Sequence, residues 1–154
     1  MLRRILAVSA FLALAAAPAQ AQIPLLDIRL GAHGALPQGD FADTHDAGVG
    51  AYFRAGVPLL FFKAMGSVTY TQFKSANPLN DDVQELMLQA GPHFSPLPLL
   101  DVGAEFGYTT DAKEWAFAPN VSVGLLMLEA TASYVKPFKN GANSWVTLGV
   151  GLRF

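Results

Sequence analysis

The last nine residues of the chain, 146–154, alternate strictly between two kinds of side chain. Val146, Leu148, Val150, Leu152 and Phe154 share one face, and threonine, glycine or arginine occupies each position between them. Because successive side chains of a β-strand point to opposite faces, this pattern predicts a strand with one apolar face and one small or polar face. A strand at a chain end frays unless a neighbour pairs with it, so the segment favours a fold in which another strand closes onto it.

Seven further segments alternate in the same way, at 25–36, 48–57, 60–73, 83–94, 99–109, 115–125 and 128–135. Most reach the roughly 9 to 11 residues that a tilted strand needs to cross a bilayer. Pro119 interrupts the sixth segment and predicts a bulge or local break there, because proline donates no backbone hydrogen bond. The pattern predicts an all-β chain of eight antiparallel strands.

The links between these segments alternate in length. Longer polar links lie at 37–46, 74–82, 110–114 and 136–143, and short links lie near 58–59, 95–98 and 126–127. Short turns on one side and longer loops on the other are typical of an up-and-down transmembrane β-barrel with both termini in the bacterial periplasm. A soluble barrel has no reason to sort its loops in this way.

Aromatic residues bracket the predicted apolar faces. A membrane barrel carries such girdles at both interfaces, because amphipathic rings prefer the headgroup region. The predicted girdle near the longer loops comprises Tyr70, Phe73, Tyr108, Trp115, Tyr134 and Trp145, and the one near the short turns comprises Phe61, Phe62, Phe94 and Phe154. The alternative is that these rings form an ordinary core.

The N-terminal segment predicts export. Residues 1–4 carry two arginines, residues 5–17 are apolar, and residues 19–21 (Ala-Gln-Ala) fit the small-x-small cleavage pattern. We therefore interpret residues 1–21 as a cleaved signal peptide and 22–154 as one β-barrel domain. A retained anchor is the alternative, but the apolar run is shorter than the roughly 20 residues of a spanning helix.

Composition also favours a membrane barrel. The whole chain is 52% hydrophobic and 14% charged, whereas about 25% charged residues is usual in a soluble domain. The predicted mature chain has 8 basic and 12 acidic residues, and this net negative charge argues against nucleic-acid binding. The chain has no cysteine, which excludes a disulfide framework, a lipid-modified cysteine and a thiol nucleophile.

The polar face of the predicted strands is expected to line the barrel lumen. It is rich in glycine, which suits a crowded interior and would weaken a solvated strand, and no charge falls on the apolar face, as lipid contact requires. The predicted lumen charge network comprises Asp27, Arg29, Arg54, Lys63, Glu85, Asp101, Glu105, Glu129 and Arg153. The alternative is a secreted lipocalin-type barrel, whose apolar face would turn inward around a hydrophobic ligand.

These nearly balanced charges are expected to pair, because an eight-stranded barrel is just wide enough for side chains to fill and an unpaired buried charge is costly. We predict a polar plug toward the short turns, in which Arg153 bridges Asp27 or Glu129 across the closing seam. The rival interpretation is a narrow ion or proton path lined by the same groups.

No metal site is predicted. The first long loop holds Asp40, Asp43, His45 and Asp46, and several oxygens of this kind could bind a hard cation. Their spacing matches no calcium loop, so a solvated acidic loop is favoured. The other two histidines, His33 and His93, fall on predicted lumen faces.

No catalytic set and no cofactor are predicted either. A small barrel with hydrolase activity needs a Ser/His/acid set at its lipid-facing rim. Ser67, Ser122 and Ser133 fall on predicted lumen faces, and no histidine is obviously placed beside one of them. The chain is therefore predicted not to be an enzyme.

From about residue 24 to 154 the chain resembles the small outer-membrane β-barrels, the group that includes the OmpA transmembrane domain, OmpX and OmpW. The resemblance lies in the alternating strands, the segment 31–41 (GAHGALPQGDF) and the terminal phenylalanine. It implies that Val150, Leu152 and Phe154 form an assembly signal for the barrel-assembly machinery. It further implies a monomer in outer-membrane lipid with a structural or surface-interaction role. A narrow channel for small or apolar solutes is the alternative.

Overall fold

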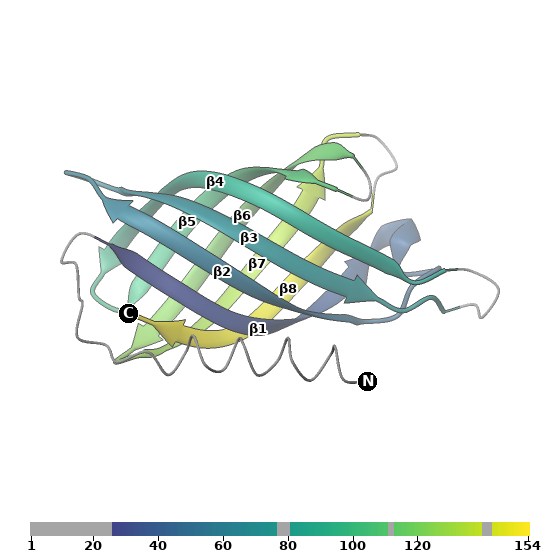
Figure 1. Ribbon diagram of the computed structural model, residues 1–154, viewed down its shortest axis with the longest axis horizontal. Coiled ribbons are helices and arrows are strands. Elements are labelled where there is room, and N and C mark those ends of the chain that lie inside the picture. The colour runs from purple at the N-terminus through teal and green to yellow at the C-terminus, as the bar shows by residue number, and fades with distance from the viewer. Residues whose placement is uncertain (1–25, 77–80, 111–112, 140–142) are drawn as a thin grey trace, which may run out of the picture.

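The computed structural model describes residues 26–76, 81–110, 113–139 and 143–154. They form one closed barrel in which each strand pairs antiparallel with its neighbours in the chain and β1 pairs with β8 (Figure 1). The strands are β1 (Asp27–Gln38), β2 (Gly48–Pro58), β3 (Lys63–Phe73), β4 (Val83–Leu97), β5 (Leu100–Thr109), β6 (Glu114–Leu125), β7 (Leu128–Pro137) and β8 (Ser144–Arg153). The predicted eight-stranded up-and-down barrel is confirmed.

The last strand closes the barrel. β8 pairs with β1 from Arg29 opposite Arg153 to Gln38 opposite Ser144. Ile28 and Phe154 extend the seam by two backbone hydrogen bonds, with N···O distances of 3.1 and 2.8 Å. The start of β1 and the end of β8 therefore lie beside the turns 59–62, 98–99 and 126–127, at what we call the turn end. The opposite loop end carries the β1–β2, β3–β4, β5–β6 and β7–β8 connections.

Two strand boundaries differ by three residues from those predicted, and the others by two at most. β3 begins at Lys63 instead of residue 60, because residues 59–62 form a turn in which Leu59 N–H donates to the Phe62 carbonyl at 2.7 Å. β4 continues to Leu97 instead of ending at residue 94, and its register with β5 shifts between Phe94 and Leu97. The barrel's irregularity is thus at the end of β4.

The bulge or local break predicted at Pro119 takes the form of a local break in the β6–β7 pairing, without a bulge. The β5–β6 register runs unbroken through Ala104 opposite Pro119. On the β7 side, the pairs Phe117–Lys136 and Asn120–Ser133 keep the same register, and only the pairs between them are missing. The strand accommodates the proline by losing local pairing without shifting.

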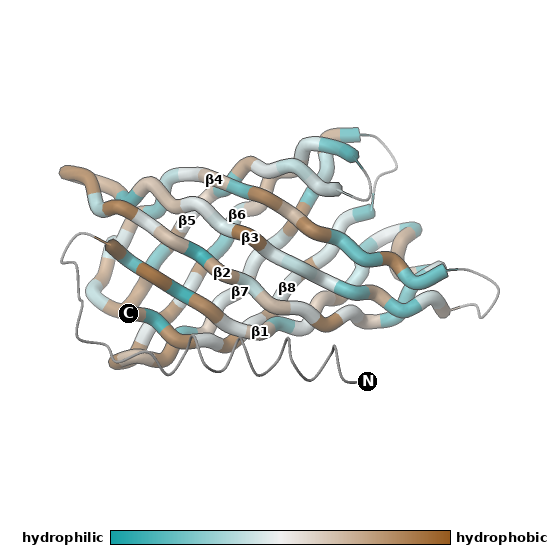
Figure 2. Tube along the Cα trace, viewed as in Figure 1, coloured by the Kyte–Doolittle hydropathy of each residue, from teal (hydrophilic) through white to brown (hydrophobic). Residues whose placement is uncertain are grey.

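The barrel is apolar outside and polar inside. Fully or nearly buried ionisable side chains include Arg29, His93, Asp101 and Glu105, with relative exposures of 0%, 0%, 1% and 1%. Large apolar side chains cover the exterior, and hydrophobic and hydrophilic residues alternate along the strands (Figure 2). A lipocalin-type barrel would have the reverse arrangement. Among the described residues, no helix is long and apolar enough to span a membrane.

The loop end of the lumen holds an apolar cluster that was not predicted. Phe41, at the end of the short 3-10 helix η1 (Gly39–Phe41), packs against Phe73 and Trp145 at centroid distances of 4.9 and 6.5 Å. Phe73 and Trp145 are 0% and 3% exposed, so their predicted place in the outer girdle is wrong. The cluster also includes Ala35, Met87, Ala116, Ala118 and Val135. It fills the mouth of the barrel with hydrocarbon.

The other predicted girdle residues near the longer loops lie on the outer surface. Tyr70, Tyr108, Trp115 and Tyr134 are 40%, 38%, 61% and 38% exposed. Tyr108 and Trp115 face each other across β5 and β6, with ring centroids 5.8 Å apart. Amphipathic rings in this position suit a membrane interface.

Candidate functional site

Arg29 is the centre of a charged cluster in the lumen at the turn end. Its Nε and Nη2 donate to the two carboxylate oxygens of Asp27, both at 2.8 Å. Nη1 donates to Glu129 Oε2 at 2.7 Å and Ser122 Oγ at 2.9 Å, and Nη2 also reaches Asp101 Oδ2 at 3.1 Å. The guanidinium, wholly buried, thus connects side chains of four strands, β1, β5, β6 and β7.

Lys63 joins two of the same carboxylates. Its Nζ donates to Asp27 Oδ2 at 2.9 Å and also to Asp101. Asp101 further accepts from Ser95 Oγ at 3.0 Å. The lysine adds β3 to the group of connected strands, and it places a second cation between Asp27 and Asp101.

His93 extends the cluster toward the middle of the barrel. Its Nδ1 lies 2.7 Å from Asp101 Oδ1 and its Nε2 lies 2.8 Å from Glu105 Oε1. An ionised carboxylate can accept hydrogen bonds but cannot donate them. Between two ionised carboxylates both nitrogens of the His93 ring therefore donate, which is the imidazolium form. Glu105 also accepts from Ser67 Oγ at 2.5 Å.

Arg153 reaches the cluster across the β1–β8 seam, where its Nη2 donates to Asp27 Oδ2 at 3.0 Å. Its side chain is 29% exposed, the largest exposure among the ion-paired cluster residues. With Arg153 included, four cations (Arg29, Lys63, His93, Arg153) connect with four carboxylates (Asp27, Asp101, Glu105, Glu129). We call this set the lumen cluster.

Two residues of the predicted network lie outside the lumen cluster. Arg54 is 6% exposed; it forms no ion pair within the described part of the chain, and its Nη1 donates weakly to Thr131 Oγ1 at 3.4 Å. Its guanidinium lies 5.0 Å from the centroid of the Tyr52 ring. Glu85 is 4% exposed and pairs in register with Thr71 on β3, farther toward the loop end.

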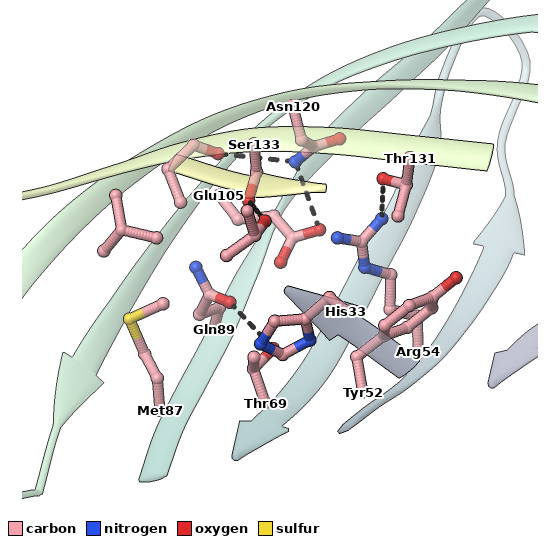
Figure 3. A pocket seen from close by; sticks show the side chains of 13 residues that line it. His33, Tyr52, Arg54, Thr69, Met87, Gln89, Glu105, Asn120, Thr131 and Ser133 are labelled. Atoms are coloured by element: carbon pink, nitrogen blue, oxygen red, sulfur yellow. Dashed lines mark hydrogen bonds between the residues drawn. The ribbon is translucent and has the colours of Figure 1, made fainter. Parts of the chain in front are cut away.

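Between the lumen cluster and the apolar mouth lies a small polar cavity (Figure 3). Its volume is about 10 Å³, which is close to the least that one water molecule needs. Arg54, Glu105 and Asn120 converge on it from three strands, and the Arg54 Nε and Asn120 Oδ1 atoms are buried without a hydrogen-bond partner in the described structure. A cavity of this size cannot hold an organic ligand.

The candidate serines are used as hydrogen-bonding groups of the lumen. Ser67 bonds Glu105, Ser122 bonds Arg29, and Ser133 bonds Thr147 at 2.6 Å. Among the described residues, no histidine is hydrogen bonded to one of the three. Each therefore has a structural partner, and none has the neighbouring histidine of a Ser/His/acid set within the described residues.

The acidic first loop brings no set of ligands together. The His45 ring packs on Phe41 at 4.6 Å, and its Nδ1 lies 2.9 Å from Thr44 Oγ1. Asp40, Asp43 and Asp46 are exposed. In the described ranges, no three His, Asp or Glu side chains converge as metal ligands would.

A close glycine contact fixes the His93 ring. A Cβ atom on Gly103 would lie 2.5 Å from three atoms of that ring, which is buried and hydrogen bonded on both sides. We expect Gly103→Ala to lower the free energy of unfolding by about 1–3 kcal/mol, since an overpacked core must shift. Urea titration in lipid vesicles measures the change. Gly34→Ala is the matched control, because a Cβ there meets only one atom, at 4.0 Å; equal effects of the two variants would contradict the packing argument.

No protein-family model matches this sequence, and no curated protein matches it closely. Solved structures do share its fold. Ail, the attachment invasion locus protein of Yersinia pestis, is 16% identical with a TM-score of 0.55 over 84% of this chain and 97% of Ail. The structure of Ail in a phospholipid bilayer nanodisc is 14% identical in sequence, with a TM-score of 0.58 over 84% of this chain and 99% of that chain. A de novo designed transmembrane β-barrel is 17% identical in sequence, with a TM-score of 0.55 over 86% of this chain and 98% of the designed chain. At these identities the likeness establishes a transmembrane-barrel fold and leaves the role open.

Proposed function

We propose that this chain is a monomeric integral outer-membrane β-barrel with a closed lumen and a structural or surface-interaction role, without catalysis. The observation that carries the proposal is the distribution of polarity. The charged lumen cluster is buried inside the barrel, and the outer surface is a belt of apolar side chains. A closed barrel with that belt satisfies its backbone without water and suits a lipid bilayer.

Two features support a closed lumen. Ion pairs join strands across the interior at the turn end, and the Phe41, Phe73 and Trp145 rings fill the interior at the loop end. The cavity between them has room for about one water molecule. The two layers therefore support a closed lumen over an open aqueous channel.

The proposed orientation has the turn end in the periplasm and the longer loops outside the cell, as short periplasmic turns are usual in such barrels. The two termini of the described barrel then face the periplasm. In this proposal Val150, Leu152 and Phe154 remain the assembly signal. On β8 the outward face is clearest at Leu148 and Val150, which are 56% and 69% exposed, while Leu152 and Phe154 are partly exposed.

Surface interaction through the loops would differ from what is recorded for Ail, which has a structure in complex with the heparin analogue sucrose octasulfate. The loops of the present chain carry six aspartates, Asp40, Asp43, Asp46, Asp81, Asp82 and Asp111, against three lysines, Lys74, Lys113 and Lys139. An acidic loop surface repels polyanions. We therefore do not extend sulfated polysaccharide binding to this chain.

Membrane insertion is tested by fractionation and gel migration. We expect the expressed protein to be found in the outer-membrane fraction and to need detergent for extraction. The unheated protein should migrate differently from the boiled protein on a denaturing gel, because a closed barrel resists detergent until heated. A protein that stays soluble and monomeric without any amphiphile would contradict the proposal.

The rival conduit is tested by conductance. The buried titratable groups of the lumen cluster and the polar cavity favour it as a second candidate. A closed lumen predicts no steady current across a planar bilayer, whereas a stepwise current would support a narrow ion path. An OmpX-type or OmpA-type barrel of known conductance, inserted in parallel, controls for insertion.

A further inference from the structure

The three turns at the turn end expose large apolar side chains. Leu60 and Phe61 at the tip of the β2–β3 turn are 93% and 85% exposed. Leu126 in the β6–β7 turn is 92% exposed, and Leu97 and Leu99 beside the β4–β5 turn are 60% and 51% exposed. Turns in water usually collect Gly, Asn, Asp and Ser. These three turns have the composition of a buried surface and no protein partner in the fold.

Charge is absent from this end of the outer surface and present at the other. No Asp, Glu, Lys or Arg occurs in the segments 57–62, 94–100 and 123–128. The exposed charged residues of the described loop end are Asp40, Asp43, Asp46, Lys74, Asp81, Asp82, Lys113, Lys136 and Lys139. One end of the barrel is therefore suited to water and the other is not.

The apolar turns continue the apolar belt with no polar boundary between them. On β2 the outward row leads from Val49 through Val57 directly to Leu59, and on β6 it leads from Trp115 to Leu125. Figure 2 shows apolar colour extending to the tip of the β2–β3 hairpin, which projects beyond the rest of the barrel. At the loop end, by contrast, the outward rows of β3, β4, β5 and β7 finish on polar residues: Gln72, Gln84, Thr110 and Lys136.

On two strands the apolar band reaches its full height only through the turns. A strand rising about 3.3 Å per residue and tilted by about 40° gains roughly 2.5 Å of height per residue. From Tyr134 to Leu128 the outward row of β7 then spans only about 15 Å, and reaching Leu126 gives about 20 Å. From Tyr108 to Leu99 the span is about 23 Å. The apolar band of a membrane barrel is about 25 Å tall, so these two rows approach it only when the turn residues are counted. The β6 row, from Trp115 to Leu125, spans about 25 Å within the strand.

We propose that the turn end is immersed in the bilayer, so that the tips of the β2–β3, β4–β5 and β6–β7 turns contact acyl chains at the headgroup boundary instead of periplasmic water. This inference rests on the proposed membrane function. A docked protein would be expected to meet an apolar centre with a polar rim, and here the apolar surface runs without a rim into the belt. The lumen cluster then lies at the depth of the periplasmic leaflet, and acyl chains surround the barrel wall at that level.

The test uses single-cysteine variants, which need no background substitutions because the chain has no cysteine. Leu60→Cys and Leu126→Cys place a label at the tips of the β2–β3 and β6–β7 turns. Leu88→Cys places it on the apolar belt, and Asp43→Cys places it at the loop end. Each is labelled with the environment-sensitive dye NBD and refolded into phosphatidylcholine vesicles, and heat-modifiable migration confirms folding. Fluorescence quenching is measured with iodide in the buffer and with nitroxide groups attached to lipid.

Immersion predicts that the two tip labels are quenched by lipid nitroxide and are several-fold less sensitive to iodide than the Asp43 label. Tip labels as accessible to iodide as the Asp43 label, with the Leu88 label protected, would overturn the inference and leave the membrane barrel standing. That result would instead favour a water-exposed end that a partner protein covers in the cell. A Leu88 label open to iodide would overturn the membrane placement itself.

Discussion

Replacing Arg29 by alanine is expected to lower the free energy of unfolding by about 3–5 kcal/mol, the usual effect of removing one partner of a buried ion pair. Arg29 is 0% exposed, and it donates to Asp27, Glu129 and Asp101 at 2.7–3.1 Å. Its removal leaves these carboxylates facing each other with fewer cations inside a closed barrel. Urea titration of the protein in lipid vesicles, followed by tryptophan fluorescence and gel migration, measures the loss.

The matched control is Arg153→Ala, which removes a cation from the same cluster. The Arg153 side chain is 29% exposed and makes one ion pair, to Asp27. Solvent screens such a pair, so we expect a loss of about 1 kcal/mol or less. Equal losses for Arg29→Ala and Arg153→Ala would show that the central position of Arg29 does not matter, and would contradict the proposed plug.

Leu88→Arg is expected to destabilise the barrel in vesicles by about 1–3 kcal/mol. A cation on the lipid face costs about 2–4 kcal/mol at the bilayer midplane and about 0–1 kcal/mol at the interface, and Leu88 lies between the two, beside Tyr108. Leu88 is 53% exposed in the middle of β4, opposite Val68 on β3 and Tyr108 on β5. In a water-facing barrel the same substitution would replace an exposed leucine by a soluble residue and cost little. Comparative urea titrations of the variant and the original protein, in vesicles of one composition, distinguish the two environments.

Ala42→Arg serves as the control for this effect. Ala42 is exposed in the first loop, just after η1, and the cation would reach water there. We expect its effect to stay within about 0.5 kcal/mol, as is usual for surface substitutions. A loss at Ala42 as large as the loss at Leu88 would mean that added charge harms the protein for a reason other than lipid contact.

The alternation of side chains made the barrel and its inside surface predictable. Lipid and lumen lie on opposite faces of every strand, so the face on which one residue lies fixes the faces of its neighbours along the strand. Lys63, Asp101 and Glu129 were assigned inward on this basis, and each is buried. The errors at Phe73 and Trp145 have the same origin. Phe73 lies on the same face of β3 as Lys63, and Trp145 lies on the same face of β8 as Thr147. The prediction gave residue type more weight than the alternation of faces.

The partners within the lumen were less predictable, because they depend on how far each strand is displaced along its neighbour. His93 was placed on the lumen face, but its bonds to Asp101 and Glu105 require the β4–β5 register, in which His93 lies opposite Gly103. The pairing of Arg153 with Asp27 was one of two options that the seam allowed. Phe41 gave no periodic pattern, because it enters the mouth of the barrel from a loop.

Some ion pairs of the lumen cluster join residues that are far apart in the sequence, and this affects how the chain can fold. Its links join residues 72 positions apart for Arg29 and Asp101, 100 for Arg29 and Glu129, and 126 for Arg153 and Asp27. No single hairpin contains these three pairs, so a partly formed sheet lacks them, whereas the pairs of His93 with Asp101 and Glu105 lie within the β4–β5 hairpin. Long-range contacts slow folding. The stabilisation from these three links is therefore expected in a late step, when the first and last strands meet.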